Sequence, residues 1–287
     1  MLQLHNAHAD ILIPDGLEQQ AALSRTTHLG ISAHQDDLEI LAFHGILQCF
    51  GISDKWFSGV VCTDGAGSPR AGIYADYSDA DMQKIRLAEQ HTAARVGQYA
   101  AMIQLGYPSK IIKDPLDSWV EADLVQILQA TTPQVIYTHN PADKHATHVG
   151  VLVKVLRAIR ALPPNQRPQT VYGCEVWRDL DWMPDERKVV LDVSGRDNLA
   201  AALVGVYDSQ IAGGKRYDLA TLARRRANAT YLESHATDVM ESAIYAIDLT
   251  PVIQDDTRDI IEFVSALIEK FRAAVTQQLR QVSVPEK

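Results

Sequence analysis

The sequence predicts an α/β protein whose mostly parallel β-sheet is covered by helices on both faces. From residue 26 onward, short apolar runs alternate with helical stretches of about 10–20 residues, which is the pattern of βαβ units. The chain has 287 residues, of which 46% are hydrophobic and 22% charged, as in ordinary globular proteins. That length allows one large domain or two small ones.

The first regular elements are expected after an N-terminal arm. Residues 1–24 show no regular pattern, and we expect them to be irregular and to pack on the domain. The apolar run Thr27–Ala33 predicts a buried strand, and the spacing of apolar residues in Leu38–Phe50 predicts a helix. Phe57–Cys62 predicts the second strand, and the small and polar residues 63–69 predict a loop.

The middle of the chain continues the alternation. Ser78 begins a long helix, because Ser78-Asp79-Ala80-Asp81 is an N-cap signature ahead of periodic apolar residues. Met102–Leu105 and Ile111–Ile112 are predicted as short strands. The later predictions are the strands Gln134–Thr138, Thr170–Val176 and Lys188–Val193 and the helices Ala122–Ala130, His145–Leu162, Asn198–Tyr207, Leu219–Ser234 and Asp259–Leu279.

Charge and cysteine content exclude several classes of protein. The 27 Lys and Arg against 36 Asp and Glu give a formal net charge of −9, which argues against a nucleic-acid partner. Cys49, Cys62 and Cys174 are odd in number and far apart, which excludes a disulfide framework and a CxxC metal knuckle. No stretch approaches the roughly 20 apolar residues of a membrane span, and residues 1–14 lack the pattern of a signal peptide. We therefore expect a protein of the reducing cytoplasm with no membrane span.

The first predicted strand leads into a cluster of metal-ligating and proton-transfer groups, His34-Gln35-Asp36-Asp37. Sites in parallel sheets form beyond the carboxyl ends of strands. Two adjacent carboxylates repel each other unless a cation or a proton separates them. His34 and Asp37 are three residues apart and can project to one side of a strand-to-helix turn, so that one carboxylate binds a metal while Asp36 handles a proton. The alternative is that Asp36 or Asp37 only caps the following helix.

A second cluster follows the strand Gln134–Thr138 and contains three of the ten histidines. His145 and His148 share a helical face, whereas His139 lies at the strand end. A histidine pair at this spacing is usually a surface feature when it stands alone. Together with the first cluster, it predicts a His/His/carboxylate site with an open position for water, which suits zinc.

The two clusters resemble the motifs of the LmbE/PIG-L family of zinc-dependent de-N-acetylases. That family has a His-x-Asp-Asp motif after its first strand and a later His-Pro-Asp-His motif, which here read His34-Gln35-Asp36-Asp37 and His145-Ala146-Thr147-His148. The resemblance covers roughly residues 26–155 and extends weakly through Arg86-Leu87-Ala88-Glu89. It implies a Rossmann-like three-layer sandwich with an added C-terminal segment, one zinc ion per chain, and removal of acyl groups from amino-sugar nitrogens.

The resemblance also implies a role for each motif residue and a division of the chain. His34, Asp37 and His148 would be the zinc ligands, Asp36 the general base, and His145 the group that stabilises the oxyanion or protonates the leaving amine. Residues 25–195 would form the Rossmann-like catalytic domain, after the arm of residues 1–24. Residues 196–287 would form a C-terminal helical segment packed on the same domain.

The sequence departs from the family pattern in both motifs. Gln35 replaces a proline that has no assigned role. Thr147 stands where the family usually has an aspartate that orients the catalytic histidine. Asp143 is the candidate to replace that aspartate as the partner of His145.

Further residues are candidates for substrate contact. The family has a basic substrate-contacting residue near the loop after the second strand, so Arg70 is a candidate for a sugar hydroxyl or phosphate contact, with a loop salt bridge equally open. Trp177 can stack on a sugar ring, with core packing as the alternative. The basic segments 213–217 and 224–226 suggest a solvated helix face or a subunit contact in preference to a substrate-anion site. His235 is a further residue that could reach the site.

We expect a zinc-dependent hydrolase acting on a small N-acyl amino sugar or its conjugate. Iron or manganese could occupy the same ligands. The alternatives are a metal-dependent phosphoesterase, which usually needs more carboxylates than the two clusters supply, and a non-catalytic Rossmann-like ligand-binding module. The sequence leaves the acyl group, the sugar and the oligomeric state open, a homo-oligomer included.

Overall fold

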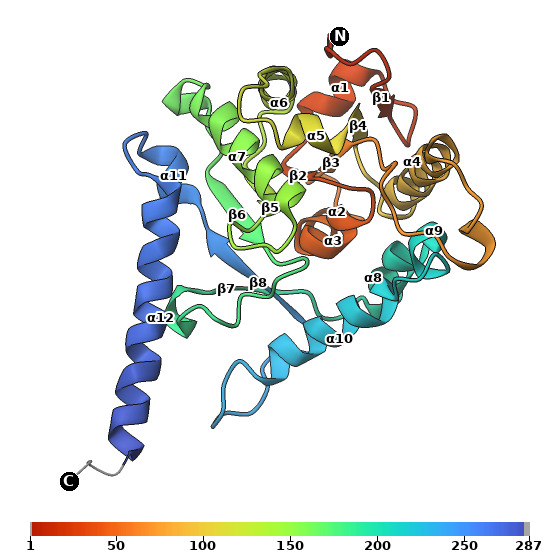
Figure 1. Ribbon diagram of the computed structural model, residues 1–287. Helices are drawn as coiled ribbons and strands as arrows, with labels where there is room; N and C mark the ends of the chain where they lie inside the picture. Colours follow the sequence, from red (N-terminus) through yellow and green to blue (C-terminus); the bar gives the residue numbers. More distant parts are fainter. Residues whose placement is uncertain (1, 284–287) are drawn as a thin grey trace.

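The computed structural model describes residues 2–283 and has a single eight-stranded sheet in the order β1-β4-β3-β2-β5-β6-β8-β7 (Figure 1). The strands are β1 (Asp10–Leu12), β2 (His28–Ser32), β3 (Phe57–Thr63), β4 (Ala101–Tyr107), β5 (Val135–His139), β6 (Thr170–Cys174), β7 (Val189–Asp192) and β8 (Ala243–Asp248). The pairings among β4, β3, β2, β5 and β6 are all parallel. Antiparallel pairings add β1 at one edge and β8 and β7 at the other. The mostly parallel sheet confirms the predicted fold class.

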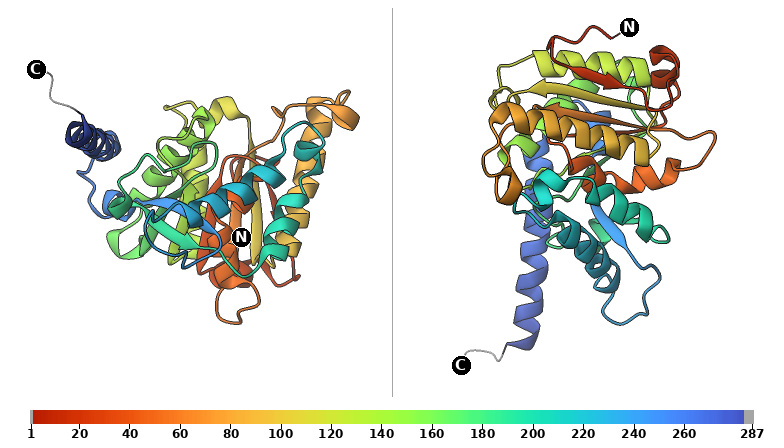
Figure 2. Two further views of the ribbon diagram at one scale, coloured as in Figure 1. Left: turned by 90° about the horizontal axis from the view of Figure 1, so that it is seen from below. Right: turned by 90° about the vertical axis from the view of Figure 1, so that its right-hand side faces the viewer.

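Helices cover both faces of this sheet (Figure 2). The helices are α1 (Gln19–Ser24), α2 (Asp37–Leu41), α3 (Phe43–Cys49), α4 (Asp79–Val96), α5 (Ser109–Ile112), α6 (Trp119–Thr131), α7 (Ala146–Arg160), α8 (Asp197–Gly205), α9 (Asp208–Ile211), α10 (Tyr217–Thr230), α11 (Thr250–Gln254) and α12 (Ile260–Val282). Two apolar cores result. One includes residues of α6 and α7, and the other includes residues of α2, α3, α4 and α8.

Where the local sequence pattern is strong, the structure contains the predicted element. Ser78 caps α4 through a capping box, in which its hydroxyl accepts from Asp81 N–H and the Asp81 carboxylate accepts from Ser78 N–H. The three cysteines are buried and free. No helix of the described residues combines the length and the apolar character needed to cross a bilayer.

Four details of the predicted elements were wrong. Residues 1–24 are not irregular, because they contain β1, which pairs with β4, and α1. Ile111–Ile112 lies in the short helix α5, not in a strand. The helix expected at Leu38–Phe50 is interrupted at Ala42 and forms α2 and α3. The C-terminal segment is not only helical, because β8 joins the sheet between β6 and β7. The division into three parts remains a prediction.

Candidate functional site

The site lies where the chain leaves the carboxyl ends of β2 and β5. These two strands are neighbours at the centre of the sheet, with β3 on the far side of β2 and β6 on the far side of β5. The loops after them therefore diverge and leave a crevice, the usual position of a ligand site in an open parallel sheet. This arrangement brings together His34 and His148, which are 114 residues apart in the sequence.

Three predicted ligands meet at the floor of this crevice. His34 Nδ1 lies 3.1 Å from His148 Nε2 and 3.2 Å from Asp37 Oδ2. His148 Nε2 lies 3.3 Å from the same Asp37 oxygen. Donors about 2.1 Å from a tetrahedral zinc ion lie roughly 3.4 Å apart. Two imidazole nitrogens and a carboxylate oxygen at this spacing therefore fit a zinc ion and leave one coordination position open.

The electrostatics of these three groups agree with a cation site. Burial alone would raise the pKa of Asp37, but His148, His34 and His139 together hold it well below its usual range. Burial lowers the pKa of His34 to about 4, so its ring is neutral and able to act as a ligand at neutral pH. Burial also opposes the charge on His148, but Asp37 and Asp143 outweigh it and raise its pKa. A carboxylate that stays ionised among imidazoles is the charge pattern that a divalent cation requires.

Asp36 has a different environment from its neighbour Asp37. Its pKa is raised well above its usual range by burial and by Asp37, with Arg86 acting in the opposite direction at 3.8 Å. Its backbone has φ 99°, a strained conformation for a residue with a side chain. The side chain makes no capping hydrogen bond to α2, although Asp36 occupies the cap position. The structure therefore does not support the alternative in which Asp36 only caps the helix.

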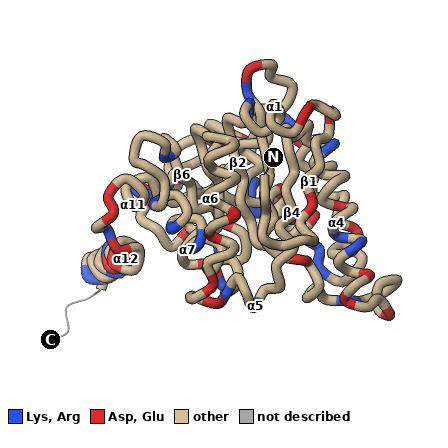
Figure 3. The backbone as a smooth tube through the Cα atoms, turned by 90° about the horizontal axis from the view of Figure 1, so that it is seen from above, with Lys and Arg blue, Asp and Glu red and all other residues tan. Residues whose placement is uncertain are grey.

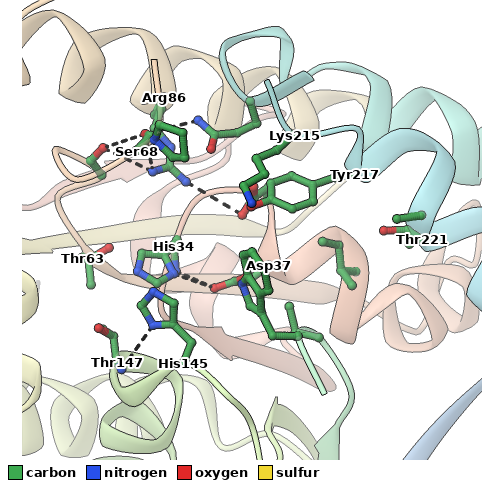
Figure 4. Close-up of a pocket in the computed structure, with 18 of the residues that line it drawn as sticks. His34, Asp37, Thr63, Ser68, Arg86, His145, Thr147, Lys215, Tyr217 and Thr221 are labelled. Atoms are coloured by element: carbon green, nitrogen blue, oxygen red, sulfur yellow. Dashed lines mark hydrogen bonds and ion pairs between the residues drawn. The ribbon is translucent and has the colours of Figure 1, made fainter. Parts of the chain in front are cut away.

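His145 caps α7 and has a defined tautomer when neutral. Its Nδ1 accepts the Thr147 backbone N–H at 3.3 Å, so the proton of the neutral ring is on Nε2 (Figure 4). Burial and the nearby His148 lower its pKa. The Thr147 backbone thus fixes the orientation of the His145 ring, which is the task that the sequence analysis gave to Asp143.

Asp143 contacts the ring of a different histidine from the one expected. Its Oδ1 accepts the backbone N–H of His145 at 2.9 Å and lies 3.4 Å from His148 Nδ1. Its Oδ2 accepts the Trp177 backbone N–H at 3.1 Å. A carboxylate behind the outer nitrogen of a ligating histidine is a common arrangement at metal centres, because it orients the ring. Asp143 is therefore placed to orient His148 rather than the ring of His145.

His139 is a site residue to which the sequence analysis gave no role. It is fully buried, and its Nε2 accepts the Ala33 backbone N–H at 2.9 Å while lying 3.6 Å from Asp37 Oδ2. Its ring stacks on His148, with a centroid distance of 3.9 Å. Since the Nε2 lone pair is engaged, His139 is placed to position Asp37 and His148 rather than to act as a ligand. The sequence analysis ended this strand at Thr138, whereas the structure includes His139 in β5.

A pocket of about 650 Å³ opens above the donor atoms (Figure 4). Trp177 is among its lining residues, as expected, and packs edge-on against Tyr217. The basic segments 213–217 and 224–226 also reach the pocket, because Lys215, Arg224 and Arg225 line it. Their position therefore agrees with a substrate-anion site, the interpretation that the sequence analysis favoured less. His235 is exposed and is not among the lining residues.

Arg70 does not take the predicted position. It forms an ion pair with the exposed Asp79 and donates to Ala66 O, and it is absent from the described lining of the pocket. The basic residue that does line the pocket beneath this loop is Arg86. Arg86 donates to Gln35 O at 2.7 Å and to Ser68 Oγ at 2.9 Å, and it approaches Asp36. The Arg-x-x-Glu pattern beginning at Arg86 was the signal that could have identified it.

Comparisons with known proteins agree with the motifs. Residues 29–159 match the model of the PIG-L family, described as GlcNAc-PI de-N-acetylase, which confirms the resemblance to the LmbE/PIG-L family in this segment. A search of curated proteins finds no match to the chain.

Several solved structures share the fold at low sequence identity. N,N'-diacetylchitobiose deacetylase from Pyrococcus horikoshii is 14% identical with a TM-score of 0.64, over 86% of this chain and 92% of that chain. The conserved protein TT1542 from Thermus thermophilus is 18% identical with a TM-score of 0.61, over 81% and 98%. The 4-carboxy-2-hydroxymuconate hydratase GalB from Pseudomonas putida is 15% identical with a TM-score of 0.57, over 78% and 95%. At these identities the likeness establishes the fold alone.

Proposed function

We propose that this chain, whose residues 29–159 match the PIG-L family, is a zinc-dependent hydrolase that removes an acyl group, in the first place acetyl, from the nitrogen of an amino sugar or its conjugate. One observation carries the proposal. The donor atoms of His34, Asp37 and His148 lie 3.1–3.3 Å from one another, next to a pocket that His34 and Asp37 line together with a second carboxylate, Asp36.

The surrounding residues supply the acid–base chemistry of amide hydrolysis. A zinc ion held by His34, Asp37 and His148 would provide Lewis acidity and lower the pKa of water beside it. Asp36 takes the proton from the attacking water and returns it to the leaving nitrogen, a role that contributes about 10²–10⁴-fold in rate. Arg86 orients the Asp36 carboxylate. His145 presents its Nε2–H to the acyl oxygen as negative charge develops there.

The arrangement of donors supports one cation rather than two. The two groups of possible ligands among the described residues, His34/His145/His148 and Asp37/His139/His148, share His148. A two-metal phosphoesterase holds two metal ions about 3.5–4 Å apart and needs enough ligands for both. The shared histidine therefore favours the hydrolase over the phosphoesterase. The free cysteines support the cytoplasm as the compartment that we propose.

The test combines metal analysis with amine release from N-acetylglucosamine derivatives. We expect about one zinc ion per wild-type chain and release of amine and acetate in equal amounts. His148→Ala should lose the metal, whereas Asp36→Asn should keep it and lose turnover. His235→Ala is the matched histidine control and should change neither quantity. Full metal occupancy in His148→Ala would remove that residue from the ligands, and wild-type turnover by Asp36→Asn would refute the assignment of the base.

A further inference from the structure

One side of the pocket is basic although the protein is acidic. The pocket is lined by five basic residues (Lys or Arg) and three acidic ones (Asp or Glu), whereas the whole chain has 27 basic and 36 acidic residues. These lining residues are Arg86, Lys113, Lys215, Arg224 and Arg225 and, of opposite charge, Asp36, Asp37 and Glu175. Three of the cations come from α10 or from the loop directly before it, so positive charge is concentrated on that wall.

The cations of this wall lack carboxylate partners among the described residues. Arg225 is 3% exposed, donates to Glu39 O at 2.7 Å, and leaves its Nε and Nη1 without a partner there. Burial lowers its pKa to about 9, so it is still charged at neutral pH. Lys215 lies over the Trp177 ring at 5.0 Å and forms no ion pair within residues 2–283. The neighbouring Glu175 is not a full counter-ion, because burial raises its pKa to about 7.

A buried cation with unmet hydrogen bonds is costly unless an anion satisfies it. We propose that the substrate carries, besides its N-acyl amino-sugar unit, an anionic group such as a carboxylate or a phosphate, and that Lys215 and Arg225 bind this group. The proposal rests on the proposed function, because it assigns a substrate class to the same pocket. It involves residues other than the proposed metal donors, since these cations come from residues 215–225.

The test measures binding and turnover of three sugars by the zinc-loaded protein. The probes are N-acetylglucosamine, its 6-phosphate, and the carboxylate-bearing N-acetylmuramic acid. We expect at least one of the anionic sugars to bind ten-fold or more tightly than the neutral sugar. Lys215→Met should remove that difference without weakening the neutral sugar, and Lys55→Met, at an exposed position outside the pocket, should not change it.

The possible outcomes separate this inference from the proposed function. Equal binding and turnover of neutral and anionic sugars would overturn the anion site while leaving the hydrolase intact. Anion preference that persists in Lys215→Met would overturn the assignment of that wall. Preference for only one anionic sugar would identify the group as phosphate or as carboxylate. Failure of all three sugars to bind or react would count against both proposals.

A second, independent observation concerns α12, which extends beyond the sheet for most of its length (Figure 1) and is seen nearly end-on at the side of the molecule in Figure 3. Leu267 is the only buried residue of this helix, all of which lies within the described part of the chain, and Ile260 and Phe263 pack beside it on the core of the domain. The helix nevertheless carries a second apolar stripe, which is exposed. Its members and their exposed fractions are Ile261 (73%), Ile268 (46%), Phe271 (39%), Val275 (40%), Leu279 (59%) and Val282 (78%).

The stripe lies on a single face of the helix. Successive members are separated by seven, three, four, four and three residues, so at 3.6 residues per turn they stay within roughly a quarter of the circumference. The helix is roughly 34 Å long at 1.5 Å per residue. A continuous exposed apolar seam of that length on a globular domain indicates an interaction surface.

Both the apolar and the charged residues of α12 are complementary to a second copy in antiparallel orientation. Pairing Ile268 with Val275 of another copy also places Ile261 opposite Val282. Residues 259–269 include three acidic and no basic side chains, whereas residues 270–282 include three basic and no acidic ones. Antiparallel pairing therefore sets opposite charges side by side, and parallel pairing would set like charges together. We infer that α12 pairs with α12 of a second copy in antiparallel orientation.

The test uses the full chain and measures its mass in solution. Sedimentation should give twice the mass of one chain for the wild type and one chain mass for the double variant Ile268→Glu/Val275→Glu. These positions are exposed, so the fold should persist, which circular dichroism checks. Thr276→Glu, on the same helix outside the stripe, is the matched control and should remain dimeric.

Oxidative cross-linking tests the direction of pairing. Ile268→Cys/Val275→Cys should form a disulfide-linked dimer at high yield, whereas Ile268→Cys alone should not. The native cysteines are buried and do not compete. A wild type that stays monomeric at the concentration of the cross-linking experiment would overturn the inference, and efficient cross-linking of the single cysteine variant would replace the antiparallel arrangement with a parallel one.

Discussion

Replacing Asp36 by glycine should make the metal-free protein more stable while abolishing its activity. The φ of 99° at Asp36 costs about 1–3 kcal/mol for a residue with a side chain, and glycine adopts it freely. Glycine costs about 0.5–1 kcal/mol through the greater entropy of the unfolded chain. Arg86 keeps its bonds to Gln35 O and Ser68 Oγ when the carboxylate is removed. The expected net gain is about 0–2.5 kcal/mol, with a rate loss of about 10²–10⁴-fold.

The assay is denaturant unfolding in EDTA, because bound metal would add its own contribution to stability. Thr132→Gly is the matched control, since Thr132 is exposed, has φ 42° at the end of α6 and lies outside the pocket lining. It should gain similar stability and keep full activity. Asp36→Asn should lose activity without the gain in stability. A glycine variant clearly less stable than wild type would refute the strain argument.

Three further predictions concern the pocket and the core. Glu175→Gln should stabilise the protein by about 2 kcal/mol at pH 8 but not at pH 4.5. Burial raises the pKa of Glu175 to about 7, so this carboxyl destabilises the folded protein progressively as the pH rises from the pKa of the unfolded chain toward 7. Denaturant unfolding at both pH values checks this. Arg70→Ala should change kcat/KM by less than about two-fold, since its ion pair is largely exposed, whereas Arg86→Gln should lower it by about ten-fold or more. Gly45→Ala should cost about 1–3 kcal/mol in thermal unfolding, because its Cβ would lie 2.5 Å from Tyr137 Cε2.

The central fold was predictable because its strands are buried on both faces. A strand such as β3 is buried throughout and ends at a loop of small residues, so its position is evident without any tertiary information. The three-residue β1 is only half-buried and lacks this signal, whereas β8 is buried at five of its six positions. Both lie in the peripheral, antiparallel part of the sheet, and their place depends on a long-range partner: β4 for β1, and β6 and β7 for β8. Local pattern cannot supply the partner of β1, whereas the apolar run of β8 is present in the sequence and was overlooked.

The proximity of the three proposed metal donors was predictable for a related reason. Parallel strands align their carboxyl ends at one edge, so residues following β2 and β5 meet regardless of their separation in sequence. The orientation of the side chains around the proposed donors was not predictable. Asp143 could have served His145 or His148, and only the cap geometry of α7 decides between them. Arg70 and Arg86 differ in the same way, because the partner of each is set by packing of the loop on α4.

The same sheet is shared with proteins named as a deacetylase and as a hydratase, so the fold alone does not determine the reaction. A cation with two imidazoles and a carboxylate activates water for either. The two reactions differ in the atom that finally receives the proton of the water and in the group of the substrate that the water attacks. At the metal side, Asp36 and the Nε2–H of His145 suit a nitrogen leaving group and an acyl oxygen. Lys215 and Arg225, which also line the pocket, come from a segment that no strand-end rule identifies. If the proposed roles hold, variants of residues 215–225 should alter the choice of substrate, while variants of residues 34–37 should alter the chemistry.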